Sequence, residues 1–265
     1  MNLGGSAGAG WRGEEYSAAA EHHRAVDDWF LARHPPRAWD TVVDLGCGTG
    51  EFTAKISASV PDGLVIGVDQ DPSMLATARR RAGANLEFLT ASATDFDGLI
   101  PPGTVDLVVS RAMLHWLPIS DYPRVFAAVH RVLRPDGWYH SESAAAGNAP
   151  GVIGLLERVA RAHDLRPPEP FPEPAPVAEL LAAAGFVIPD DGVRAVPQRR
   201  PFTRDELAAM LRTTAAVALT RQAPAAAHAR LAEELADAVD ELRAPDGTYD
   251  QTFVRLEILV HTPVP

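Results

Sequence analysis

The sequence predicts an α/β protein built on a doubly wound, mainly parallel β-sheet. Apolar segments rich in β-branched residues, typical of buried strands, alternate with segments of helical periodicity. The first apolar segment, at residues 41–45, leads into a glycine-rich loop and then into a predicted helix at 51–59. Strand, glycine loop and helix in this order open the nucleotide-binding part of a doubly wound domain.

The glycine-rich loop has the form Asp-x-Gly-x-Gly-x-Gly, from Asp44 to Gly50. Its glycines permit positive φ angles and let a ligand approach the backbone closely. The spacing differs from the dinucleotide fingerprint Gly-x-Gly-x-x-Gly. A buried acid at position 44 suits an ammonium or sulfonium group far better than a pyrophosphate. The alternative is that Asp44 only caps the helix that begins at Glu51.

From Asp44 to Gly50 the chain reads Asp-Leu-Gly-Cys-Gly-Thr-Gly, which resembles the first motif of class I S-adenosylmethionine-dependent methyltransferases. Leu-Arg-Pro-Asp-Gly at 133–137 is also similar to this family, and the likeness extends over about residues 42–143. It implies a Rossmann-like sheet of seven strands, in the order 3-2-1-4-5-7-6, with the last strand antiparallel. It also implies S-adenosylmethionine as cofactor, held in part by five loop residues: Asp44, Gly46, Cys47, Gly48 and Gly50.

The second predicted strand, at 64–68, is followed by the acid Asp69. An acid at this position accepts hydrogen bonds from ribose hydroxyls. The alternative is that Asp69 caps the helix predicted at 72–81, although Asp71 or Ser73 could do so as well. Gln70 and Met74 are then expected where an adenine would rest.

A third strand is predicted at 86–89, and the segment after it, 90–96, is similar to the third motif of the same family. The family's acid, which contacts the adenine amino group, is replaced here by Ser92. Ala93 still offers its backbone N–H to the adenine. Asp95 is expected to be a surface or capping residue.

The fourth predicted strand, at 105–110, leads directly into Arg111 and the residues after it. Ligands of such sheets bind beyond the carboxyl ends of the strands, at the switch point that the first and fourth strands flank. Ser110, Arg111 and His115 are therefore expected to contact the cofactor, and Arg111 and Trp116 the acceptor. His115 is a candidate general base; the alternative is a histidine packed beside Trp116.

The remaining elements follow from periodicity and turn residues. An amphipathic helix is predicted at 121–133, a turn at 134–137 and the fifth strand at 138–143. After these we expect helices at 151–163 and 177–184, a sixth strand opened by Phe186, helices at 203–220 and 225–242, and a last strand at 253–260. Thr203 and Glu206 have the spacing of a capping box.

We expect one structural domain in three parts: an N-terminal helical lid (1–40), a cofactor-binding core (41–143) and a C-terminal part that completes the sheet (144–265). The resemblance places the end of the sixth strand and the start of the seventh on the active-site side. Insertions at 144–176 and 198–250 are therefore expected to form a helical cap that encloses a small acceptor and excludes water.

Further acceptor contacts are predicted from the lid and the cap. Tyr16 belongs to a Trp-x-x-x-x-Tyr segment that often covers the cofactor in the resembled family, with simple packing as the alternative. After His115, the candidate bases are His22, His23 and Glu142, in that order; at most one of the two adjacent histidines faces the acceptor. Arg111 and Arg212 are placed to meet an anionic acceptor, with a surface role as the alternative for each. Tyr249 is also expected at the acceptor.

Composition restricts the partners. Hydrophobic residues make up 46% and charged residues 22% of the chain, as in ordinary globular proteins. The formal net charge of −11 disfavours a nucleic-acid partner. The single cysteine excludes an intrachain disulfide and fits a reducing cytoplasm. Without an apparent secretion signal or membrane span, we expect a cytoplasmic monomer or homodimer that binds no metal.

Together these features predict an S-adenosylmethionine-dependent enzyme that methylates an O, N or C atom of a small molecule, in bacterial secondary metabolism. The central and C-terminal parts resemble the trans-aconitate methyltransferase group, which would make the acceptor a carboxylate. Two other classes remain open. One is an NAD-dependent oxidoreductase, against which the glycine spacing and Asp44 argue. The other is a cofactor-binding protein that transfers no methyl group.

Overall fold

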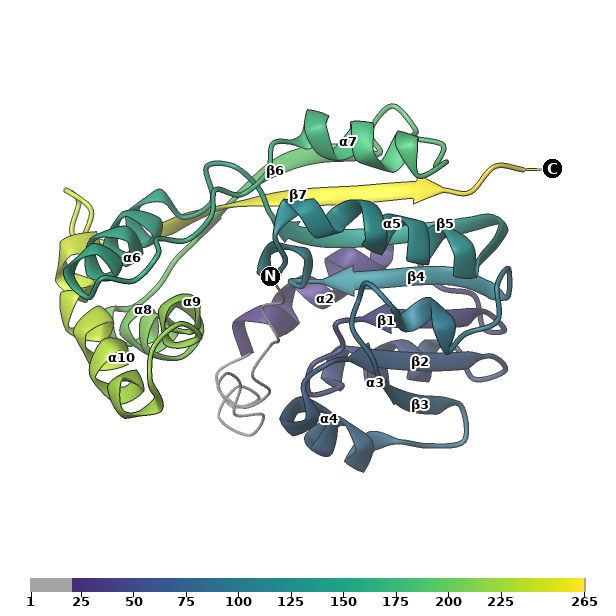
Figure 1. Cartoon of the computed structure of the whole chain (residues 1–265), viewed down its shortest axis with the longest axis horizontal. Coiled ribbons are helices and arrows are strands. Elements are labelled where there is room, and N and C mark those ends of the chain that lie inside the picture. The colour runs from purple at the N-terminus through teal and green to yellow at the C-terminus, as the bar shows by residue number, and fades with distance from the viewer. Residues whose placement is uncertain (1–20, 265) are drawn as a thin grey trace. The chain divides into compact units, whose positions relative to one another are not determined.

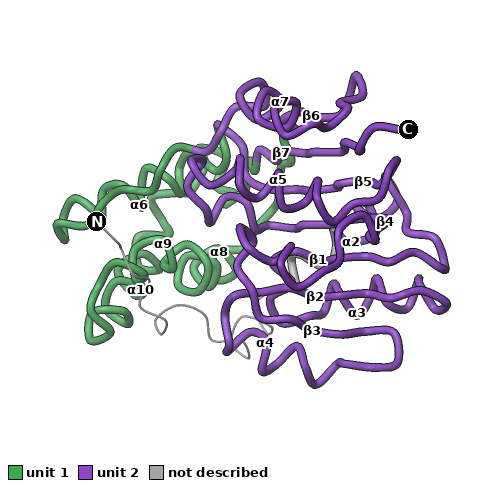
Figure 2. Tube along the Cα trace, turned by 45° about the vertical axis from the view of Figure 1, so that its right-hand side comes forward, with its two compact units in different colours: residues 1–20, 147–170, 197–253 green, residues 21–146, 171–196, 254–265 purple. Residues whose placement is uncertain are grey.

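The computed structural model describes residues 21–264, with side chains from Asp27 onward. They form two compact units (Figure 2), an α/β unit of residues 21–146, 171–196 and 254–264, and a helical unit of residues 147–170 and 197–253. Tyr16 lies outside the described residues. His22 and His23 belong to a described helix, but their side chains lie outside the described part.

The α/β unit is built on a seven-stranded sheet with the order β3-β2-β1-β4-β5-β7-β6 (Figure 1). Strands β1 to β5 pair in parallel, and β7 runs antiparallel to β5. The predicted sheet and its strand order are therefore confirmed. The strands are β1 (Thr41–Leu45), β2 (Leu64–Asp69), β3 (Leu86–Thr90), β4 (Val105–Arg111), β5 (Leu133–Ala144), β6 (Val193–Arg200) and β7 (Gln251–His261).

Helices cover both faces of this sheet, because successive strand residues point to opposite sides and both sides are apolar. The helices are α2 (Glu21–Arg33), α3 (Glu51–Ser59), α4 (Pro72–Ala78), α5 (Tyr122–Val132) and α7 (Pro174–Ala183). Phe126 of α5 and Leu181 of α7 share one buried cluster with Val43. Phe30 of α2 and Ile56 of α3 share another with Val42. Because strand residues point alternately to two apolar faces and helices cover both, the architecture is doubly wound.

The helical unit has its own buried core, to which Leu156, Leu207 and Leu235 belong. Its helices are α6 (Pro150–Ala162), α8 (Arg204–Met210), α9 (Val217–Thr220) and α10 (His228–Asp237). Thr203 and Glu206 form the predicted capping box at the start of α8. A π-helical turn, Leu211–Ala215, interrupts the single helix predicted at 203–220. The bounds of the unit are close to those of the two predicted insertions, and their covering role stays a prediction.

Two predicted boundaries were wrong. Phe186 does not open the sixth strand, which begins at Val193. A turn intervenes, in which Gly192 N donates to Pro189 O (2.8 Å). The turn predicted at 134–137 lies within β5 as an irregularity, since Val105 is paired with Leu133 but Leu107 with Trp138. Within residues 21–264, none of the helices has the length and hydrophobicity of a transmembrane segment.

Candidate cofactor and acceptor site

The predicted site residues of the α/β unit gather at the carboxyl ends of its parallel strands. Asp44 is the penultimate residue of β1, and Asp69 ends β2. Asp44 is paired with Val109 of β4, and Arg111 of β4 with Glu142 of β5. The sheet therefore brings residues that are far apart in the sequence to one edge, as the sequence predicts.

The glycine loop adopts a conformation that only glycine enters easily. Gly46, Gly48 and Gly50 have φ angles of +80°, +55° and +77°. A Cβ atom on Gly46 would also overlap the Met113 side chain. By contrast, a Cβ on Gly48 would meet no described atom within 4 Å, so a ligand has space at this position. The amides of Gly46 and Cys47 donate to Val68 O (2.8 and 3.0 Å) and fix the loop against the end of β2.

Asp44 is a buried acid whose described contacts include no positive charge. Its side chain accepts a hydrogen bond from Thr53 Oγ1 (2.7 Å), and no ion pair to it occurs among the described residues. Burial raises the pKa of Asp44 to about 7; the Thr53 hydrogen bond opposes this shift, and the charge of Asp69 adds to it. The N-cap of α3 is Gly50, without a side-chain hydrogen bond, so the capping alternative for Asp44 is wrong.

Asp69 joins the first two loops of the site. Its carboxylate accepts from Gly48 N (2.9 Å) and from Asp71 N (2.8 Å). Burial raises the pKa of Asp69, and these backbone donors oppose the shift. The N-cap of α4 is Asp71, which accepts from Ser73 N, so the capping alternative for Asp69 is wrong. A carboxylate has further lone pairs, and these remain suited to hydroxyl donors.

The residues predicted around the adenine differ in environment. Gln70 is exposed, whereas Met74 of α4 is buried. Ser92 and Ala93 are half-buried after β3, and Ser92 Oγ lies 3.0 Å from Thr94 Oγ1. Their contact with adenine stays a prediction. Asp95 lies on the surface, as predicted, and pairs with Arg124 (2.8 Å).

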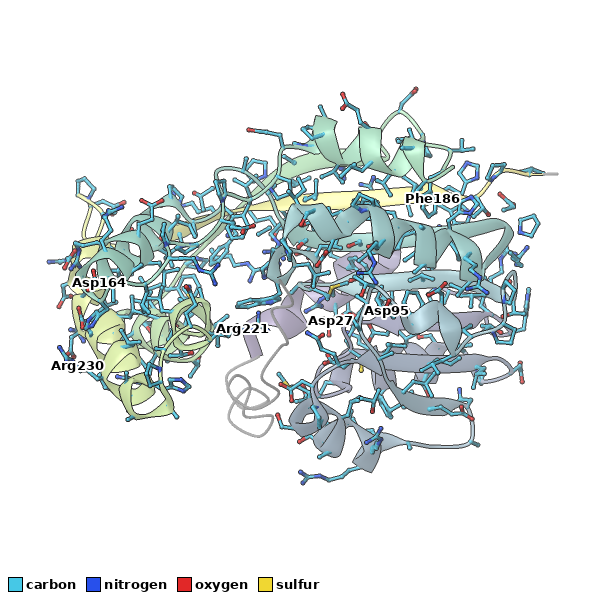
Figure 3. All side chains as sticks on the ribbon, in the orientation of Figure 1. Asp27, Asp95, Asp164, Phe186, Arg221 and Arg230 are labelled. Atoms are coloured by element: carbon cyan, nitrogen blue, oxygen red, sulfur yellow. The ribbon has the colours of Figure 1, made fainter. Side chains whose placement is uncertain are left out.

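Arg111 and Glu142 are both held by charged partners. Arg111 is ion-paired with Asp27 of α2, a residue labelled in Figure 3, and its guanidinium lies over the Phe52 ring (4.9 Å to the centroid). The surface alternative for Arg111 is therefore wrong. Glu142 is buried and ion-paired with Arg255 of β7, so this candidate base already has a strong hydrogen-bond partner. Sequence analysis missed Asp27 and Arg255, because their roles depend on contacts distant in the chain.

His115 lies in a short 3₁₀ turn, Leu114–Trp116, that follows β4. Its ring centroid is 5.1 Å from that of Trp116 and 6.0 Å from that of Phe171, which presents an edge-to-face contact. Its Nδ1 lies 2.9 Å from Ser143 Oγ. His115 thus packs beside Trp116, which fits the alternative of a packed histidine. It also lies near the strand ends, where the candidate general base was expected. Ser143 was missed; Phe171 carried the weak signal of an aromatic residue in a proline-rich connector.

The predicted acceptor contacts of the helical unit also have partners within that unit. Arg212 is 43% exposed and pairs with Glu233 (2.9 Å), which fits the surface alternative. Tyr249 Oη donates to Asp240. A hydrogen bond from Arg204, followed by that from Tyr249, lowers the pKa of Asp240 to about 2. No group of three or more His, Cys, Asp or Glu residues in the described part of the chain could hold a metal ion.

The geometry around the glycine loop fits S-adenosylmethionine. Among the described residues no cation pairs with the buried Asp44, and this cofactor carries an ammonium and a sulfonium group. Asp69 offers acceptor lone pairs for ribose hydroxyls. Gly48 leaves space beside the loop backbone. NAD would instead bring a pyrophosphate to a loop that contains a desolvated acid, which is unfavourable.

Comparisons with known proteins agree with this assignment. Residues 42–137 match the family model described as "Methyltransferase domain". A trans-aconitate 2-methyltransferase from Deinococcus radiodurans is 33% identical over 190 residues, which cover 67% of this chain and 70% of that protein. A trans-aconitate 2-methyltransferase from Rhodococcus jostii is 27% identical over 259 residues, which cover 94% of this chain and 98% of that protein.

Solved structures add a likeness of fold. The YcgJ protein from Bacillus subtilis aligns with a TM-score of 0.60 at 18% identity, over 92% of this chain and 100% of that one. At this identity the match supports the architecture alone. Fold, glycine loop and sequence relatives lead to one conclusion: the chain belongs to the class I S-adenosylmethionine-dependent methyltransferases, and S-adenosylmethionine is its cofactor.

Proposed function

We propose that this enzyme transfers a methyl group to a carboxylate oxygen of a small organic acid and so forms a methyl ester. The names of the relatives from Deinococcus radiodurans and Rhodococcus jostii support an acidic acceptor. The structural observation that carries the proposal is the ion pair of Glu142 with Arg255. It occupies the one carboxylate among the candidate bases, and a carboxylate acceptor needs no base because it already bears the attacking charge.

The chain's own residues then have mainly binding and positioning roles. Asp44 would hold the cationic part of the cofactor, and Asp69 the ribose hydroxyls. The bound cofactor supplies a methyl group on positively charged sulfur. Transfer forms one C–O bond and breaks one S–C bond, and it neutralises both an anion and a cation. Exclusion of water and alignment of the reacting groups therefore favour the reaction.

Three residues of the α/β unit are suited to the acceptor. Trp116 and Phe171 offer aromatic surface, and His115 lies against both rings. An acid with an unsaturated or otherwise flat carbon skeleton fits such surroundings. Two bacterial relatives also support the predicted bacterial source. Secondary metabolism, a cytoplasmic location and the oligomeric state stay predictions.

The proposal is tested by incubating the full chain with S-adenosylmethionine and a panel of acceptors. The panel contains trans-aconitate, its cis isomer, its saturated analogue, unsaturated monocarboxylic acids, and a phenol and an amine as non-acid controls. Mass spectrometry would follow S-adenosylhomocysteine and the methylated product. We expect methylation of one or more acids, and mild alkali should release methanol from the product.

Two outcomes would contradict the proposal. One is an alkali-stable product, formed from the phenol or the amine while every acid remains unmodified. The other is tight cofactor binding without S-adenosylhomocysteine formation in the presence of any acid. The Asp44→Ala variant is the matched control, because it removes the cofactor contact and should abolish all enzymatic product.

A further inference from the structure

We propose that Ser143 is a positioning residue that holds His115 in the tautomer with hydrogen on Nε2. His115 then acts on the acceptor acid as a hydrogen-bond donor, and not as a general base. This inference rests on the proposed function, since it concerns the contact between His115 and an acid.

One hydroxyl group contacts both the backbone and the ring of His115. Ser143 Oγ lies 2.9 Å from the backbone N of His115 and 2.9 Å from its ring Nδ1. Ser143 is fully buried and belongs to β5, where it is paired with Leu256 of β7. A hydroxyl on a central strand has a fixed position, so it restricts both the turn that carries His115 and the ring itself.

The two contacts together determine where the hydrogen atoms lie. A serine hydroxyl has one donor hydrogen and two acceptor lone pairs. The backbone N–H of His115 can only donate, so it occupies one lone pair. If Nδ1 also donated, the hydroxyl hydrogen would need a third partner, and Ser143 Oγ has no other hydrogen bond among residues 27–264.

A buried donor without a partner is strongly unfavourable. The arrangement that satisfies every group has Ser143 O–H donating to an unprotonated Nδ1. In the neutral imidazole the hydrogen then lies on Nε2.

This tautomer decides between the two chemical roles of His115. A general base needs a lone pair, and the Nε2–H form offers none at that atom. A carboxylate is acceptor-only when ionised, so it is the natural partner of Nε2–H. The rings of Trp116 and Phe171 pack against the imidazole and limit its rotation. Ser143 thus favours acids over phenols, which require a base.

The tautomer can be measured without any acceptor. Nitrogen-15 NMR of histidine-labelled full-length protein, at a pH where the imidazole is neutral, distinguishes Nδ1–H from Nε2–H. The signal that disappears in His115→Asn identifies the residue. We expect Nε2–H in the wild type and a mixture of tautomers in Ser143→Ala. Ser143→Thr keeps the hydroxyl and should restore the wild-type signal; Ser143→Cys, with a weaker donor, serves if the threonine variant does not fold.

Ser141→Ala is the matched control. Ser141 is a buried serine on the same strand and the same face of the sheet, two residues away, and no hydrogen bond joins it to His115 in the described structure. Its removal should leave the His115 signal unchanged. A wild-type signal from Nδ1–H, or a tautomer that is the same in Ser143→Ala, would overturn the proposal.

Kinetics supply a second, independent readout. With both substrates saturating, a donor role predicts a kcat that changes less than about twofold between pH 8 and pH 6, because neutral and protonated imidazole both donate from Nε2. A base role predicts a fall of about tenfold per pH unit on the acidic side. Such a fall, absent from His115→Asn, would overturn the donor role. If the tautomer is as expected but no acid is methylated, the proposed function fails and the positioning by Ser143 stands.

Discussion

Asp44 and Glu142 are two carboxylates at the same edge of the sheet, and their burial is nearly equal, with 2% and 3% of their surface exposed. Glu142 forms an ion pair with Arg255, whereas the only side-chain partner of Asp44 within residues 27–264 is the hydroxyl of Thr53. Burial accordingly raises the pKa of Asp44 to about 7. A buried charge needs a partner. The partner of Glu142 belongs to the protein, and we propose that the partner of Asp44 is the cationic cofactor.

The largest effect is expected for Glu142, the acid that forms an ion pair within the protein. Glu142→Gln leaves Arg255 buried without its counter-ion, and it should lower the free energy of unfolding by about 3–5 kcal/mol. Cofactor affinity should stay within about twofold in the folded fraction, because Glu142 is engaged by Arg255. Urea unfolding and calorimetric titration measure the two quantities. The double variant Glu142→Leu/Arg255→Met should recover most of the lost free energy of unfolding. A loss of the same size in the double variant would contradict the view that the unpaired charge of Arg255 causes it.

The second largest effect is expected at Asp44, for which no ion pair occurs in the described part of the chain. Asp44→Asn should weaken S-adenosylmethionine binding about 100-fold, which corresponds to about 3 kcal/mol for contacts to a charged group. The free energy of unfolding of the ligand-free protein should be unchanged or higher, because a desolvated carboxylate is removed. Calorimetric titration with S-adenosylmethionine, S-adenosylhomocysteine and NAD gives the affinities. Unchanged affinity in a folded variant would refute the role of Asp44.

The elevated pKa of Asp44 also predicts a pH dependence. Only the ionised carboxylate attracts a cation, so below pH 7 protonation competes with binding, and affinity should fall by up to about tenfold per pH unit. Above about pH 8 affinity should be constant. The ligand-free protein should show the opposite trend, because the folded state holds this proton more tightly than the unfolded state. Its stability contribution is present near pH 4 and is lost as pH rises to about 7.

Asp44→Asn is the control for this dependence, since it removes the titrating group. Binding measured between pH 5.5 and pH 8.5 should lose most of its slope in the variant. A slope that persists unchanged would assign the dependence to another group, of which Asp69 is the nearest acid with a raised pKa.

The smallest effect is expected at an exposed ion pair of the helical unit. Arg212→Ala should change the free energy of unfolding by less than about 1 kcal/mol, because solvent screens the pair of Arg212 with Glu233. The comparison with Glu142→Gln isolates the contribution of burial. KM for the acceptor acid should be unchanged if Arg212 has only this surface role. A tenfold rise in a stable variant would instead support the acceptor contact predicted from the sequence.

Much of the site could be predicted because its signals are local. The order of strands and glycines around Asp44 and the strand-end position of Asp69 depend on neighbouring residues, and both residues lie at the predicted edge of the sheet. Two predicted element boundaries differed from the structure. The sixth strand begins at Val193 because the turn at 189–192 comes first, and the helix predicted at 203–220 contains a π-helical turn.

The fold class, the cofactor and the strand-end position of Asp44 could be predicted from the amino-acid sequence, because periodicity, glycine spacing and strand ends are encoded by residues close together in the chain. The side chains that pair with these residues could be identified only from the folded structure. Arg255 meets Glu142, Asp27 meets Arg111, and Ser143 meets His115, each across a long sequence separation. Whether a buried acid or a histidine is structural or functional depends on such partners, and only the folded sheet brings them together.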